Sequence, residues 1–176
     1  MGILPAMKIL PVTLCLALLA TAAHAAPKPE ALGNFSHWNA YTHEEAPGKP
    51  VCYMATPPVK SSGKYKSRGP VFLMITNRPG EGTGHVVSHV AGYPYDESQP
   101  VKADIDGTEF LMIPKADMAW TPNQKSDNIL ADALRKGNKL TVTGISTKGT
   151  KTVDNYSLKG AGKALDAIDK ACPPAN

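Results

Sequence analysis

The sequence has few aromatic residues and few cysteines, and no long hydrophobic run follows its first 25 residues. Aromatic side chains make up 6% of the 176 residues, and three residues are cysteine. Because a bilayer-spanning helix needs about 20 apolar residues, we expect no transmembrane segment after residue 25. A dense basic stripe is also missing, since 19 Lys and Arg stand against 15 Asp and Glu. We therefore expect no nucleic-acid partner.

Motifs that carry catalytic chemistry are missing as well. The chain has no G-x-S-x-G nucleophile elbow. Ser88 and His89 are neighbours in a predicted strand, where adjacent side chains point to opposite faces. They therefore cannot act together as a nucleophile and its base. The glycine-rich segment 80–84 leads into that strand and lacks the Lys-Ser/Thr ending of a phosphate-binding loop. These absences predict a protein that is not an enzyme and carries no cofactor.

The first 25 residues have the pattern of an export signal. Lys8 supplies a positive charge, residues 9–23 form an uncharged apolar run, and a small-x-small cleavage motif ends at Ala25. We expect residues 1–25 to be removed as a signal peptide. The mature protein is then predicted to reside in the periplasm, or at the outer surface or outside the cell after secretion.

Removal of the signal leaves a chain long enough to bury one hydrophobic core. Residues 26–34 are rich in Ala, Pro, Lys and Glu, so we expect them to form a flexible leader. The full sequence has the 42% hydrophobic content of an ordinary globular protein. We predict that residues 35–173 form a single domain.

Export also bears on the pairing of the cysteines. Cys15 lies inside the signal, which leaves Cys52 near the start of the domain and Cys172 near its end. Two cysteines in an oxidising compartment form one disulfide, and this one would hold the C-terminus against the core. The alternative is a reactive or metal-binding thiol pair, although neither cysteine lies in a CxxC motif or at a helix start.

Short runs rich in β-branched and aromatic residues predict a mainly β protein. The strongest hairpin signal is Asp106-Gly107, because a type I′ turn needs a positive φ at both central residues. The run 71–76 is continuously apolar, which indicates a central buried strand. The predicted strands are 35–41, 51–56, 71–76, 85–90, 101–105, 108–113, 119–121, 140–144 and 150–153.

Two segments have helical rather than strand periodicity. In the first, Ser126 is placed to cap the helix start, and Gly137 follows the last turn. The second follows Gly160 and ends before Pro173. Together these elements predict an antiparallel β-sandwich or partly open barrel with two short helices, one of them C-terminal.

Basic residues concentrate in the predicted loop 57–69. This loop is interpreted by default as a solvated surface loop. The alternative is a site that binds an anionic polymer of the bacterial envelope or of a host-cell surface. Its candidate binding residues are Lys60, Lys64, Tyr65, Lys66 and Arg68. A second basic group lies near the first helix and the last hairpin, and consists of Arg135, Lys136, Lys139, Lys148 and Lys151.

Histidines provide an alternative site, in which zinc or copper would be the ligand. The mature chain carries four of them, and a metal site needs three or four ligands that converge. His85 and His89 lie on one predicted strand, about 13 Å apart, which is too far for both to bind the same ion. The candidate ligands are His37, His43, His85 and His89.

Several landmarks follow one another in a distinctive order along the chain. They are Trp38 with 51–54, the segment 69–78, the Asp106-Gly107 hairpin, Leu134-Arg135-Lys136-Gly137, and 156–160 with Ala164-Leu165 before Cys172. In this order and spacing, the sequence resembles the invasion-associated locus B family of exported bacterial proteins over nearly the whole mature chain.

The resemblance implies a small β-rich protein of the periplasm or surface of a Gram-negative bacterium. The family is named for host-cell invasion or colonisation and brings no active-site motif. We therefore predict a non-enzymatic envelope or surface protein that binds a protein or a surface polymer in host-cell invasion, colonisation or envelope maintenance. The alternative is a periplasmic zinc- or copper-binding protein that uses the four histidines.

Overall fold

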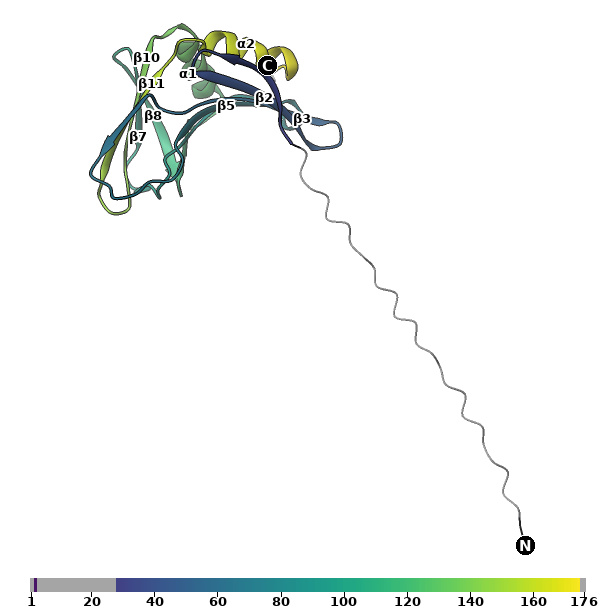
Figure 1. The fold of residues 1–176 in the computed structure, drawn as a ribbon, viewed down its shortest axis with the longest axis horizontal. Helices are drawn as coiled ribbons and strands as arrows, with labels where there is room; N and C mark the ends of the chain where they lie inside the picture. Colours follow the sequence, from purple (N-terminus) through teal and green to yellow (C-terminus); the bar gives the residue numbers. More distant parts are fainter. Residues whose placement is uncertain (1, 3–27, 175–176) are drawn as a thin grey trace.

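The computed structural model describes residue 2 and residues 28–174. Within these residues, eleven strands form one antiparallel sheet in the order β1-β2-β3-β5-β6-β9-β8-β7-β10-β11-β4. Strands β1 and β4 stand at the two ends of this order, so the sheet is open (Figure 1). The predicted signal peptide 1–25, including Cys15, lies outside the described residues except for Gly2.

The sheet consists of two halves that meet at β8, which pairs with β9 on one side and with β7 on the other. The first half contains β1 (Glu30–Phe35), β2 (Trp38–Ala46), β3 (Lys49–Thr56), β5 (Phe72–Arg78), β6 (Thr83–Val90) and β9 (Met118–Trp120). The second half contains β8 (Thr108–Lys115), β7 (Val101–Ile105), β10 (Lys139–Ile145), β11 (Lys151–Ser157) and β4 (Lys60–Gly63). A short 3-10 turn, η1 (Pro79–Glu81), connects β5 to β6.

Two α-helices in the described part of the chain, α1 (Gln124–Lys136) and α2 (Ala161–Ala171), pack on the first half of the sheet. In Figure 1 they lie along the upper side of the molecule, with β7, β8, β10 and β11 labelled toward the left. Neither helix is long and apolar enough to cross a membrane. The cap of α1 is Asn123 and not the predicted Ser126, because the Asn123 side chain accepts a hydrogen bond from the backbone N–H of Ser126.

One hydrophobic core fills the space between the helices and the two halves of the sheet. Trp38 and Met54 enter it from the first half, Tyr156 from the second, and Leu165 and Ile168 from α2, each with at most 2% of its surface exposed. Full burial of a large apolar side chain stabilises a fold by about 1.5–3 kcal/mol. The apolar side of each element is therefore what holds the helices on the sheet.

A disulfide bond joins the C-terminal end of α2 to β3. It connects Cys52 with Cys172, whose Cα atoms are 5.7 Å apart. The predicted pairing is therefore present. Because α2 packs on β1, β2 and β3, the bond reinforces a contact that the apolar side of the helix already makes.

The predicted fold class is confirmed, since the described chain is mainly antiparallel β structure with two α-helices, one of them C-terminal. The Asp106-Gly107 turn has the expected positive φ values, 50° and 95°. Strand β5 lies centrally between β3 and β6. Burial alternates only in its first half, where Leu73 and Ile75 are buried and Phe72 is 38% exposed.

Two segments predicted to be irregular contain strands. Part of the expected leader 26–34 belongs to β1, which starts at Glu30 and pairs with β2 across a bulge at Gly33. The expected loop 57–69 contains β4, which pairs with β11. Neither segment has an apolar alternation of its own. Both are strands because their backbone N–H and C=O groups pair with a neighbouring strand.

Candidate functional site

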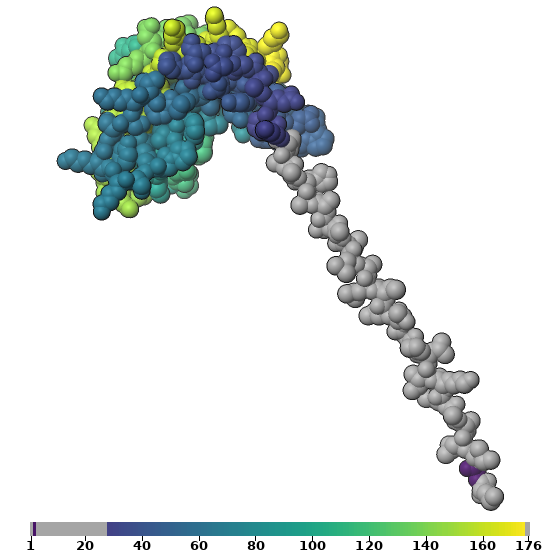
Figure 2. Space-filling view, viewed as in Figure 1, coloured from purple at the N-terminus to yellow at the C-terminus, as the bar shows by residue number. Residues whose placement is uncertain are grey.

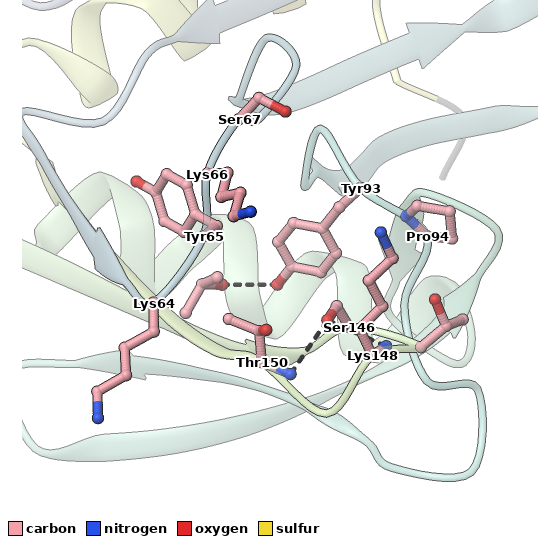
Figure 3. A pocket seen from close by; sticks show the side chains of 11 residues that line it. Lys64, Tyr65, Lys66, Ser67, Tyr93, Pro94, Ser146, Lys148 and Thr150 are labelled. Carbon is pink, nitrogen blue, oxygen red and sulfur yellow. Dashed lines mark hydrogen bonds between the residues drawn. The ribbon is translucent and has the colours of Figure 1, made fainter.

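A cavity of about 460 Å³ opens where the segment after β4 faces the turn between β10 and β11. We call it the lysine pocket, because three lysines and no acidic residue line it (Figure 3). Its lining residues are Lys64, Tyr65, Lys66, Ser67, Tyr93, Pro94, Ser146, Thr147, Lys148, Thr150 and Thr152. Figure 2 shows the blue segment that follows β4 beside the yellow-green β10–β11 hairpin, at one end of the folded part.

The β10–β11 turn places Lys148 at the pocket. The Ser146 hydroxyl accepts hydrogen bonds from the backbone N–H groups of Lys148 and Thr150, at 3.3 and 3.1 Å. Gly149 adopts a φ of 75°, which glycine tolerates best. Tyr95 forms an isolated β-bridge with Ser146, which holds the base of the turn against the segment 91–96. The turn is therefore fixed by its own hydrogen bonds before any ligand binds.

A buried ion pair lies behind the pocket. The Arg68 guanidinium donates two hydrogen bonds of 2.7 Å to the Asp154 carboxylate, and its Nε donates to the carbonyl of Ala91 at 2.5 Å. The two charged side chains are only 5% and 1% exposed. Burial by itself would lower the pKa of Arg68, but the hydrogen bonds and charge of Asp154 outweigh it and raise that pKa above its ordinary value.

The same guanidinium positions two aromatic rings of the pocket. Its central carbon lies 4.9 Å from the ring centroid of Tyr93 and 5.6 Å from that of Tyr65. The Tyr93 hydroxyl also forms a 2.6 Å hydrogen bond with the Thr152 hydroxyl. Cation–π contacts of this kind are attractive. The pocket wall is thereby tied to the ion pair beneath it.

His89 extends this polar network into the core. Its Nδ1 lies 2.7 Å from the Tyr95 hydroxyl and its Nε2 lies 2.8 Å from the Tyr156 hydroxyl. Nε2 is also 3.7 Å from the Asp154 carboxylate. Burial lowers the pKa of His89 to about 4, and the attraction of Asp154 only partly offsets this. The imidazole is therefore neutral at physiological pH.

The structure brings together part of the predicted basic site. Lys64, Tyr65 and Lys66 line the lysine pocket. Lys60 is exposed at the start of β4 and is not a lining residue. Arg68 differs from the other predicted residues, because its charge is neutralised by Asp154 in the protein interior and it supports the pocket from behind.

Sequence reasoning missed the opposite wall of the pocket. On sequence alone, Lys148 belongs to a separate basic group, and Tyr93, Thr147 and Thr150 are not singled out as site residues. Lys148 is 82 residues after Lys66 in the sequence. The sequence feature that pointed to this wall was the basic charge of the β10–β11 turn. No neighbouring residue, however, indicates which loop faces that turn.

The four histidines do not converge. Both ring nitrogens of His89 are hydrogen-bonded to tyrosine hydroxyls. His85 Nε2 lies 2.9 Å from the Asp169 carboxylate on α2. His43 packs edge-on against Tyr53 with 6.0 Å between ring centroids. Across the described residues, no three His, Cys, Asp or Glu side chains form a group that could hold a metal ion.

A second polar cluster secures the end of α2. The buried Asn77 amide donates to the Asp169 carboxylate at 2.8 Å and to the carbonyl of Cys172 at 3.0 Å, and its oxygen accepts from the backbone N–H of His85. Arg135 of α1 donates to the same carboxylate. Burial would raise the pKa of Asp169, but its hydrogen bonds with the His85 imidazole and with Asn77, and the charges of His85 and Arg135, lower it. The cluster therefore has a structural role beside the disulfide.

Comparison with known proteins adds three findings. The sequence profile of the family described as "Invasion associated locus B (IalB) protein" matches residues 38–169. The crystal structure of invasion associated protein B from Bartonella henselae has a similar fold, with a TM-score of 0.53 and 17% sequence identity over 82% of this chain and 97% of that one. No curated protein sequence matches the chain.

Proposed function

Because the chain belongs to the invasion associated locus B family, we propose that it is an exported, non-enzymatic protein that binds an anionic polymer at the bacterial envelope or at a host-cell surface. The family name connects the protein with host-cell invasion. Export is supported by the signal pattern of residues 1–25, and binding by the chemistry of one surface cavity.

The observation that carries the proposal is the composition of the lysine pocket. Three ammonium groups, from Lys64, Lys66 and Lys148, line a cavity that contains no carboxylate. The nearby carboxylate of Asp154 is already neutralised by Arg68. The pocket therefore carries a net positive charge, which attracts anions over roughly 8–10 Å at physiological salt.

A binding role also agrees with the state of the buried histidine. A general base has to accept a proton near neutral pH and to reach its substrate. His89 is fully buried, has a pKa of about 4 and is hydrogen-bonded at both ring nitrogens. Its position favours a structural contribution to the pocket wall over acid–base catalysis.

The test is polyanion binding by the mature protein. We would measure retention on immobilised heparin, as a host-type polymer, and co-sedimentation with purified lipopolysaccharide, both at low salt. The triple variant Lys64→Glu, Lys66→Glu, Lys148→Glu should bind at least one of these at least tenfold more weakly than the parent protein, with a nearly unchanged melting temperature.

The control has the same change of charge away from the pocket. It combines substitutions at three exposed lysines near the helices, Lys125→Glu, Lys159→Glu and Lys163→Glu. This variant should lose less than half as much binding free energy as the pocket variant. If the two triple variants lost equal binding free energy, the loss would come from the change in net charge alone. The proposed function would then be wrong.

A further inference from the structure

The lysine pocket combines three kinds of groups that a plain polyanion site does not need. Besides the lysines, it contains the aromatic rings of Tyr65 and Tyr93 and a set of hydroxyl side chains. We propose that the pocket recognises a single sugar unit that carries a phosphate or carboxylate group. This inference rests on the proposed function and adds to it the chemical unit that the site recognises.

The charged part of the ligand is assigned to two lysines. In the view of Figure 3, the amino groups of Lys66 and Lys148 lie on either side of the Tyr93 ring, whereas Lys64 extends away from it. Arg68 cannot serve this purpose, because both of its terminal nitrogens are bound to Asp154. Lysine binds phosphate or carboxylate as a compact point charge, so two of them suit one anionic group.

The sugar ring is assigned to the tyrosines and hydroxyls. One face of a pyranose ring is rich in C–H groups and packs well on an aromatic ring, while its hydroxyls need donors and acceptors. Tyr93 is held for this contact by Arg68 and Thr152, and Tyr65 is 39% exposed at the rim. Thr147 and Thr150 provide hydroxyls, which both donate and accept hydrogen bonds.

The size of the cavity limits how much of a polymer it can hold. Its volume of about 460 Å³ falls in the range of small-molecule sites, roughly 300–1,000 Å³. That space suits the single sugar unit proposed here together with its anionic group. The remainder of a polymer would extend over the surface, where Lys64 and Lys151 line a shallower neighbouring depression.

The test compares four small probes by isothermal titration: glucosamine 1-phosphate, glucuronate, glucose and inorganic phosphate. The first is a unit of bacterial lipopolysaccharide and the second of host glycosaminoglycans, so their relative affinities identify the source of the polymer. We expect at least one charged sugar to bind tenfold or more tightly than both glucose and inorganic phosphate.

Variants then assign the contacts. Lys66→Ala and Lys148→Ala should each weaken binding of the charged sugar about tenfold. Tyr65→Ala should weaken the charged sugar severalfold and leave binding of inorganic phosphate unchanged. Lys60→Ala is the matched control, since this exposed lysine lies on the same segment outside the pocket, and it should bind like the parent protein.

Failure of this inference is distinguishable from failure of the proposed function. The pocket does not recognise a sugar if inorganic phosphate binds as tightly as both charged sugars, or if none of the four probes binds. That conclusion holds whether or not the pocket lysines are needed for binding heparin or lipopolysaccharide. If a charged sugar binds with the expected variant pattern but neither polymer does, the site recognises a small ligand and the polymer-binding function is wrong.

Discussion

Arg68 and Asp154, 86 residues apart in the sequence, form an ion pair that is joined by two hydrogen bonds of 2.7 Å. The pair lies between the lysine pocket and the hydrophobic core. It contacts Tyr93 on the pocket side and His89 on the core side. The pocket wall therefore depends on a buried charge pair that does not itself face the ligand.

Breaking this pair should be strongly destabilising. Arg68→Met or Asp154→Leu leaves one uncompensated buried charge, and we expect the free energy of unfolding to fall by about 3–5 kcal/mol. The double variant should recover much of that loss, because no isolated charge remains. Urea denaturation of the mature, oxidised protein measures the free energy of unfolding of the two single variants and the double variant.

An exposed ion pair provides the comparison. Lys102 and Glu109 are 3.1 Å apart, and both are about half exposed. Lys102→Met should therefore cost less than about 1 kcal/mol. A comparably small loss for Arg68→Met would mean that burial of the Arg68–Asp154 pair does not matter.

Stability should depend on pH through His89. Burial lowers its pKa from 6.5 to about 4, so between these values the unfolded chain binds a proton that the folded chain excludes. The free energy of unfolding should therefore fall as the pH drops from about 6.5 to about 4, by about 3 kcal/mol from this group. Above about pH 6.5 the contribution is complete.

The variant His89→Gln isolates this effect. Urea denaturation of both proteins at several pH values between 7.5 and 4 gives the two pH dependences. Other groups, such as Asp169, titrate in both proteins, so the difference between the curves belongs to His89. The same slope in parent and variant would contradict the assignment.

The disulfide should contribute substantially to stability. It closes a loop with a sequence separation of 120 residues, for which chain entropy gives a stabilisation of about 5 kcal/mol. We expect Cys52→Ser with Cys172→Ser, or reduction of the parent protein, to lower the free energy of unfolding by that order. Thiol labelling of unfolded, unreduced mature protein should modify neither cysteine; modification of both would disprove the bond.

Gly160 should tolerate no side chain. It caps α2 with a φ of 95°, and a Cβ there would overlap the carbonyl oxygen of Phe35. Gly160→Ala should therefore cost at least about 3 kcal/mol. Gly149 has a similar φ of 75° but open space around it, so Gly149→Ala should cost only about 1–2 kcal/mol. Equal thermal shifts for the two variants would show that the close contact with Phe35 is unimportant.

Local chemistry in the sequence was enough to predict several elements. Asp106-Gly107 specifies a tight turn because few other dipeptides adopt two positive φ values. Leu165 and Ile168 recur with helical spacing, so the apolar side of α2 and the direction of Cys172 followed from the pattern. The cysteine pairing followed from the predicted export, since one cysteine lies in the predicted signal peptide and only two remain.

The lysine pocket was decided by tertiary structure. Lys66 and Arg68 are both basic and stand two residues apart, yet one lines the cavity and the other is buried against Asp154. Lys148 lines the same cavity as Lys66 only because β4 pairs with β11. The four residues of β4, Lys-Ser-Ser-Gly, include no apolar side chain from which a strand could be predicted. The sequence by itself determined the main strands and the helices, because these depend on neighbouring residues. Which charges meet, and which remain free to bind, depends on pairings between distant segments, and those exist only in the folded chain.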